Sequence, residues 1–190
     1  MIKKTVMAAA LMAALPLVAV ADDAETLATN KQAAKTLIQS FFSELKGELV
    51  GAMKRGGPME ALQVCQHVAP AIAHHHSANG WEVGRTALRA RNAGNQPDAW
   101  ERQVLTQFEQ QKAAGTPVDQ LMHAELVTEN GQRYFRMMKA IPTGEVCLKC
   151  HGKAIADPVA AKIKQLYPED QATGFSLGDI RGAFTLRKAL

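Results

Sequence analysis

The sequence predicts an α+β fold with at least one antiparallel pair of strands, and two observations lead to this class. The first is a long apolar stripe near the N-terminus, with residues at spacings of three and four, which is typical of an amphipathic helix. The second is Asn130-Gly131 between two β-like runs, residues 123–129 and 132–141. This dipeptide is the strongest short-range signal of a hairpin, so an all-helical fold is excluded.

The first helix is expected over about residues 24–54, and its stripe consists of Ala34, Leu37, Ile38, Phe41, Leu45, Leu49 and Met53. Gly56-Gly57-Pro58 ends it, and Pro58 suits the first turn of a second helix. In that second helix Cys65 shares an inward face with Leu62, Ala69 and Ile72. Pro70 has no N–H to donate to the carbonyl of Gln66, so a kink is expected just after Cys65.

The remaining elements alternate between the two types. Residues 81–88 resemble a strand and are followed by an irregular arm, residues 89–97. Asp98 and Glu101 form the pattern of a capping box at the start of a third helix, which Gly115-Thr116-Pro117 ends. A helix is expected at about residues 159–166 and β structure at 174–186.

The N-terminus has the features of a secretory signal peptide. A basic start with Lys3 and Lys4 precedes an uncharged apolar run that Pro16 interrupts, and Ala19-Val20-Ala21 supplies small residues for cleavage. We expect a signal peptide at residues 1–21, a single domain at residues 22–190 and a periplasmic location. The apolar run is short for a membrane span, and no later segment approaches that length, so no membrane span is expected after cleavage.

Composition excludes some classes of partner. Removal of Lys3 and Lys4 lowers the formal charge from +4 to +2, and no long basic run remains. Aromatic residues are only 5% of the chain, which disfavours a stacking platform for single strands. We therefore expect no nucleic-acid partner. Three cysteines in an exported protein leave one thiol without a disulfide partner, which requires an explanation.

Cys147-Leu148-Lys149-Cys150-His151 matches the C-x-x-C-H signature of c-type haem attachment. In such a motif the two thiols form thioether bonds to the haem vinyl groups, and the adjacent imidazole becomes the proximal iron ligand. The export signal supports this interpretation, because covalent attachment takes place outside the cytoplasm in bacteria. We therefore expect one covalently attached haem c, with a hydrogen bond at the second ring nitrogen of His151.

The residues leave the sixth iron ligand open. The methionine candidates, Met122, Met137 and Met138, lie where methionines usually fill gaps in a core. The histidine candidates are His67, His74, His75, His76 and His123, of which the run at 74–76 is typical of a solvated surface. Cys65 would also explain the odd thiol count, although a free cysteine is often simply a small buried residue. Arg85, Arg89 and Arg91 alternate as strand residues on one side would, and are candidates to bind the haem propionates or to form a solvated basic edge.

Most of the chain after the signal peptide resembles the PAS-like, single-haem c-type domain family whose iron is held by histidine and cysteine. The matching blocks are ALQVCQHVAP at 61–70, the segment from Arg85 to Arg91-Asn92, NQPDAWE at 95–101, CLKCHG at 147–152, YPEDQATGF at 167–175 and GDIRGAF at 178–184. The resemblance implies a PAS-like antiparallel sheet flanked by helices, with Cys65 as the distal ligand opposite His151. Ala93 departs from the family, which often has proline there.

Three functions are weighed. The first is a redox- or gas-responsive sensor module that binds a diatomic gas and signals to a separate, unidentified partner protein. The second is a periplasmic electron-transfer cytochrome with a redox partner. The third is a structural zinc site made of Cys147, Cys150, His151 and Cys65, which the export signal disfavours. No catalytic constellation is found besides the haem motif, so an enzyme is not expected.

Overall fold

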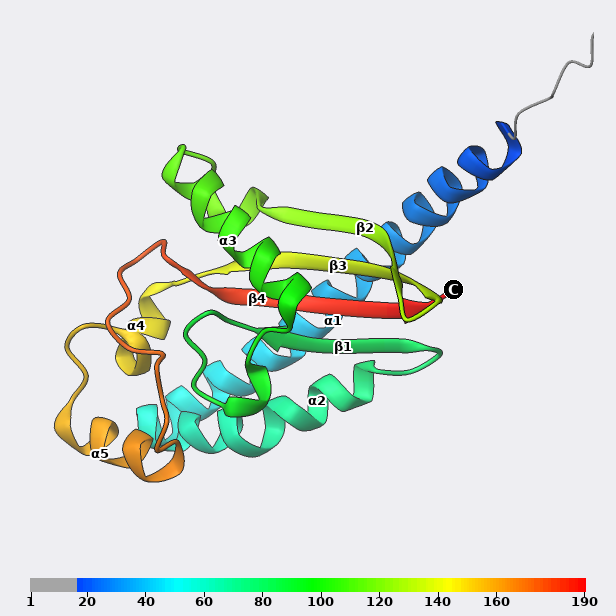
Figure 1. Ribbon diagram of the computed structural model, residues 1–190. Coiled ribbons are helices and arrows are strands. Elements are labelled where there is room, and N and C mark those ends of the chain that lie inside the picture. Colours follow the sequence, from blue (N-terminus) through cyan, green and yellow to red (C-terminus); the bar gives the residue numbers. More distant parts are fainter. Residues whose placement is uncertain (1–16) are drawn as a thin grey trace, which may run out of the picture.

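A computed structural model describes residues 17–190 of the protein, and its centre is a four-stranded antiparallel sheet (Figure 1). The strands lie in the order β1-β4-β3-β2, so the last strand of the chain is central. Their bounds are β1 (Trp81–Thr86), β2 (Met122–Glu129), β3 (Gln132–Pro142) and β4 (Ile180–Ala189). Most of the expected signal peptide, residues 1–16 of 1–21, lies outside the described residues.

Five α-helices and a π-helical segment accompany this sheet in the described part of the chain. They are α1 (Leu17–Gln63), the π-helix (Val64–Val68), α2 (Ala69–His76), α3 (Ala99–Ala113), α4 (Glu145–His151) and α5 (Asp157–Leu166). The backbone of α1 leaves helical geometry at Gly56 and at Gly57, where φ is 64° and ψ is −154°. The expected break between the first two helices is therefore present. None of the helices in residues 17–190 combines the length and apolar character that a membrane crossing requires.

The helices cover both faces of the sheet (Figure 1). On one face the α1 stripe, through Ala34, Ile38 and Phe41, packs together with Ile72 of α2 against the strands. On the other face α3 contributes Val104, Leu105 and Phe108 to a second apolar cluster. This arrangement confirms the predicted α+β fold, a PAS-like antiparallel sheet flanked by helices with a long N-terminal helix.

Two local predictions are confirmed in detail. Asn130 and Gly131 both have positive φ, 51° and 81°, and connect β2 to β3 as the hairpin requires. At the start of α3 the Asp98 carboxylate accepts from the Glu101 N–H at 2.7 Å, and the Glu101 carboxylate accepts from the Asp98 N–H at 3.1 Å. Both halves of the capping box are thus formed.

Other bounds differ from the sequence predictions. The strand expected to reach Leu88 ends at Thr86, and the β structure expected from Gly174 begins at Ile180. The kink expected after Cys65 takes the form of a π-helix, in which the N–H of Ala69 donates to the carbonyl of Val64. Pro70 has no N–H with which to continue the regular ladder, so the extra residue is accommodated just before it.

Candidate functional site

A cavity of about 440 Å³ lies at one end of the sheet, next to the apolar core that α1 covers. The ends of β1 and β3 and the start of β4 reach it, while α1, the π-helix and α4 supply the other walls. Its lining is mainly apolar with a few polar groups, and its volume falls in the range of about 300–1,000 Å³ that is usual for cofactor pockets. Cys65, Arg85, Arg91, Cys147, Cys150 and His151 all line it.

The C-x-x-C-H motif forms α4, a short helix that the sequence did not predict. Cys147 and Cys150 are three residues apart, so they lie on the same side of that helix, and both are half-buried thiols. Gly152 follows because a side chain does not fit there: an added Cβ would lie 2.5 Å from the carbonyl oxygen of Leu148. The glycine at the end of α4 is therefore required by close backbone packing and not by a positive φ.

His151 is held in one orientation by the segment between α5 and β4. Its Nδ1 lies 2.6 Å from the carbonyl oxygen of Ala172, which can only accept, so Nδ1 carries the proton and Nε2 keeps a free lone pair. Phe175 meets the imidazole edge-to-face with ring centroids 6.3 Å apart. Burial, with further influence from Arg181 and Arg91, lowers the pKa of His151 well below 6.5. The expected hydrogen bond at the second ring nitrogen is present, and the neutral imidazole suits metal ligation.

Cys65 lines the same cavity from the π-helix, although it lies more than 80 residues before Cys147 in the sequence. Burial raises the pKa of its thiol, whereas the positive charges of Arg85, Arg91 and Arg181 act in the opposite direction. Two cysteines and a histidine from α4 and one cysteine from the π-helix thus share a single cavity. π-helical turns occur frequently at functional sites, and this one aims Cys65 into the site.

Arg91 positions the histidine rather than standing free in the cavity. Its guanidinium pairs with both carboxylate oxygens of Asp170, at 3.0 and 3.1 Å. It also donates to the carbonyl of Cys150 at 2.7 Å and to that of Ala172 at 3.2 Å. Arg91 therefore joins the C-terminal end of α4 to the carbonyl that holds His151.

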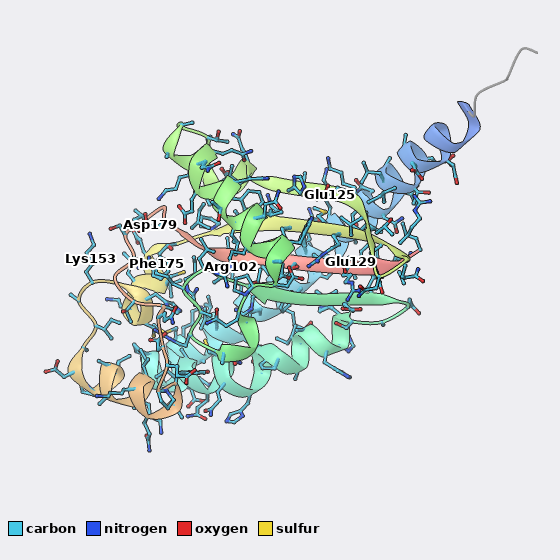
Figure 2. The ribbon with its side chains drawn as sticks, viewed as in Figure 1. Arg102, Glu125, Glu129, Lys153, Phe175 and Asp179 are labelled. Atoms are coloured by element: carbon cyan, nitrogen blue, oxygen red, sulfur yellow. The ribbon has the colours of Figure 1, made fainter. Side chains whose placement is uncertain are left out.

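The three predicted arginines do not lie on one side of a strand, which corrects that expectation. Only Arg85 belongs to β1; Arg89 and Arg91 lie beyond its end. Arg89 is exposed, packs on the Phe175 ring at 3.7 Å and donates to the carbonyl of Thr173, and it does not line the cavity. Figure 2 shows Phe175 and Asp179 in the segment that runs past α4 toward β4.

Arg181 is a cavity residue that sequence reasoning missed. It stands at the start of β4, directly before Gly182, whose φ of +154° and close approach exclude a side chain. An added Cβ at Gly182 would lie 2.5 Å from the carbonyl oxygen of Thr86. The Arg-Gly pair in the sequence was the available signal, because the glycine brings β4 against β1. Among the described residues neither Arg181 nor Arg85 forms an ion pair with a carboxylate.

The structure also separates the candidates for the sixth ligand. Met137 and Met138 are fully buried in the two core clusters, and Met122 packs beside the first. None of these methionines lines the cavity, nor does any of His67, His74, His75, His76 and His123. His76 instead contacts Glu44 at 2.9 Å. Of all these candidates, only Cys65 shares the cavity with His151; a further methionine there, Met53, was noted only as part of the apolar stripe.

Comparison with known proteins identifies a similar structure and a matching family. The crystal structure of the cyanobacterial haem protein Tll0287 is similar, with a TM-score of 0.53 and 25% sequence identity over 82% of this chain and 93% of that one. No match is found among the curated proteins. The profile of the Tll0287-like family matches residues 13–188, nearly the whole sequence. These matches confirm the resemblance indicated by the sequence blocks, and the chain belongs to the Tll0287-like family.

Proposed function

We propose that this chain is an exported c-type haem protein that acts as a redox- or gas-responsive sensor module and not as an enzyme. In this proposal Cys147 and Cys150 hold one haem covalently, and His151 and Cys65 are the axial ligands of its iron. The observation that carries the proposal is the gathering of these four residues around one cavity. Family membership and the similarity to a haem protein support the choice of cofactor.

The arrangement favours a flat cofactor over a single ion. Among residues 17–190 no three His, Cys, Asp or Glu side chains converge closely enough to hold a metal ion. The thiols and the imidazole instead border a cavity of about 440 Å³ with mainly apolar walls. A zinc site would need its four ligands at a common centre, about 2.0–2.3 Å from the metal. The cavity therefore suits a porphyrin better than zinc.

Charge in the cavity suits the same cofactor. Arg85 and Arg181 line it with no carboxylate partner in the described part of the chain, so each is available to pair with an anionic group of a ligand. Haem carries two carboxylates, its propionates, and charge-assisted contacts with these two arginines would satisfy both sides. We assign Arg85 and Arg181 to this role. Arg91 keeps its positioning role through Asp170, and Arg89 has no part in the cavity.

The setting of Cys65 favours a sensor. When bound, haem supplies an iron that alternates between ferric and ferrous states and a sixth position that takes CO, NO or O₂. Cys65 would bind the ferric form as a thiolate, because a metal deprotonates a coordinating thiol. Its π-helical turn, between the Gly56-Gly57 break and Pro70, is an adjustable support for a ligand that leaves on reduction. Release of Cys65 is then the change that a partner protein would read.

The alternative function is a periplasmic electron-transfer cytochrome, and one observation favours it. Phe42 and Val146 border the cavity and are 45% and 43% exposed, although both are apolar. Exposed apolar side chains around a cofactor edge are a typical contact surface for a redox partner. A ligand set that changes on reduction would slow such a carrier, so the behaviour of Cys65 decides between the two functions.

Acid–acetone extraction of the purified, red protein tests the attachment. We expect the haem to stay on the polypeptide, since thioether bonds survive conditions that break coordination bonds. A Cys147→Ser, Cys150→Ser variant reconstituted with haem is the matched control and should release its haem into the organic phase. Recovery of the porphyrin from the wild-type protein in acetone would refute covalent attachment. A colourless, zinc-containing protein made with a working haem-attachment system would refute the haem proposal altogether.

A further inference from the structure

Met53 is a sulfur side chain at the cavity that the proposed ligand set does not use. The described residues contain the methionines Met53, Met59, Met122, Met137 and Met138. Of these, Met53 alone lines the cavity, where it shares the walls with Cys65 and His151. Met53 is half-buried, so its thioether is neither locked in the core nor free in solvent. Its unbranched side chain adapts readily to a new contact.

The two sulfur side chains stand on either side of a break in the helix. Met53 lies three residues before Gly56, in the last regular turn of that part of α1. Cys65 lies after the break, in the π-helix. Val64 belongs to the small apolar cluster against which Met53 packs, so the two segments are in contact. Gly57, at φ 64° and ψ −154°, has a conformation that glycine alone adopts readily, so the two segments meet at a joint that depends on this glycine.

We propose that Met53 is an alternative axial ligand that replaces Cys65 when the iron is reduced. This inference rests on the proposed function, namely on covalent haem with Cys65 as the ferric ligand. An external one-electron donor, such as dithionite, supplies the electron that converts ferric to ferrous iron. The bond from iron to Cys65 Sγ breaks, and that sulfur takes up a proton from solvent to become a thiol. A lone pair of Met53 Sδ then forms the new bond to iron, so charge and atoms balance.

The exchange follows the preferences of the two oxidation states. A neutral, soft thioether suits electron-rich ferrous iron, and methionine ligation raises reduction potentials relative to more donating ligands. An anionic thiolate suits ferric iron for the opposite reason. The ferrous protein would then be closed by Met53, and a diatomic gas would have to displace a weak thioether. Sensitivity to such a gas would be set by Met53 rather than by Cys65.

The test compares the wild-type holoprotein with Met53→Leu and with Met59→Leu as the matched control. Leucine keeps the apolar volume of Met53 with little disturbance of packing. Met59 is 42% exposed and does not line the cavity, so its replacement removes a thioether elsewhere. The readouts are the spin and coordination state of the ferrous iron by resonance Raman and the rate and affinity of CO binding.

We expect six-coordinate, low-spin ferrous iron in the wild type and in Met59→Leu, with CO binding rates that level off at high CO concentration. In Met53→Leu the ferrous iron should be five-coordinate and high-spin. Its CO binding rate should rise linearly with concentration, and its CO affinity should rise about tenfold or more, because the competing ligand is gone. The ferric spectra of all three proteins should agree.

Identical ferrous spectra and CO kinetics in Met53→Leu and the wild type would overturn the inference. If Met53→Leu fails to accumulate, the wild type alone decides, since a five-coordinate ferrous form with linear CO kinetics excludes Met53 as ligand. A Cys65→Ser variant separates this outcome from failure of the proposed function. An altered ferric spectrum there, with no effect of Met53→Leu, removes the inference and leaves the proposed function in place.

Discussion

At the scale of single residues, the cavity is positively charged. Arg85, Arg91 and Arg181 approach it, and Asp170 is the carboxylate that pairs with one of them, Arg91. Burial, followed by the neighbouring charges of Arg91 and Arg85, lowers the pKa of Arg181 to about 10. The guanidinium therefore stays protonated at neutral pH even in this setting. This positive charge would stabilise an anionic ligand and would disfavour ferric iron, which carries one more positive charge than ferrous iron.

Replacing Arg181 by Gln should lower the reduction potential of the haem. Loss of a positive charge near the iron stabilises the ferric form by an amount on the order of 1 kcal/mol, for a unit charge at an effective dielectric constant of about 20. Arg89→Gln is the control, because Arg89 is exposed and lies outside the cavity. Redox titration of both variants measures the difference. Equal potentials in Arg181→Gln and the wild type would contradict the assigned position of Arg181.

The sequence predicted which residues lie at the site better than it predicted the groups that those residues contact. The cavity is lined, as expected of a common site, by the motif residues, by Cys65 and by two of the three predicted arginines, Arg85 and Arg91. Arg89 was misplaced because alternation was extended three residues beyond the true end of β1. The partner of His151 is a backbone carbonyl, that of Ala172, and a main-chain acceptor leaves no signature in the side-chain sequence.

At the scale of elements, the buried ion pair between Arg91 and Asp170 links the arm after β1 to the segment before β4, and Arg91 also donates to the carbonyl of Cys150 in α4. The Arg91 and Asp170 side chains are only 6% and 8% exposed, and Asp170 also accepts from the N–H of Ala172 at 2.8 Å. Ala172 in turn holds His151. The orientation of the His151 imidazole thus depends on a contact between residues 79 positions apart in the chain.

Asp170→Asn should destabilise the protein by about 3–5 kcal/mol, because it leaves the buried guanidinium of Arg91 without a counter-charge. Glu82→Gln removes one partner of the exposed contact with Arg187 and should cost less than about 1 kcal/mol. Glu82 is 69% exposed, which makes it a suitable control. Denaturant unfolding of the holoproteins gives both values. Similar losses in the two variants would show that the Arg91–Asp170 pair is not the structural tie described here.

The elements with local signals were predicted well. The hairpin at Asn130-Gly131 and the capping box at Asp98 were recognised because their geometry is set within four residues. By contrast α4 is seven residues long, too short to be stable from local preference alone, and depends on Arg91 and the packing at Gly152. Elements of that kind depend on distant contacts and are not visible in a local pattern.

At the scale of the whole molecule, the site joins the N-terminal helical part of the described chain to its C-terminal part. Cys65 belongs to the helical layer that covers one face of the sheet, whereas His151 belongs to the segment that precedes the last strand. An iron bound to both would cross-link these parts in the ferric state. Release of Cys65 on reduction would remove that link, which gives the sensor proposal its structural consequence.

The reduction potential should therefore depend on pH. In the proposed ligand set, Cys65 would be bound as a thiolate in the ferric state and would become a free thiol in the ferrous state, and burial raises the pKa of that thiol. Reduction takes up one proton at every pH below the pKa of that thiol and above that of the bound thiolate, so the potential should rise as pH falls, by about 59 mV per unit. Potentiometric titration across neutral and mildly alkaline pH measures this slope. A flat potential, with a ferrous form that excludes CO, would favour the electron-transfer function instead.

The most direct test of ligation by Cys65 and His151 is the ferric electron spin resonance spectrum of wild-type, Cys65→Ser and His67→Ala proteins. His67 is exposed on the same π-helical turn and serves as the control. The wild type and His67→Ala should give a low-spin, thiolate-ligated signal. Cys65→Ser should convert this signal to a high-spin or water-bound form, because the anionic sulfur is lost. An unchanged low-spin spectrum in Cys65→Ser would make Cys65 an ordinary buried thiol and contradict the proposed ligation.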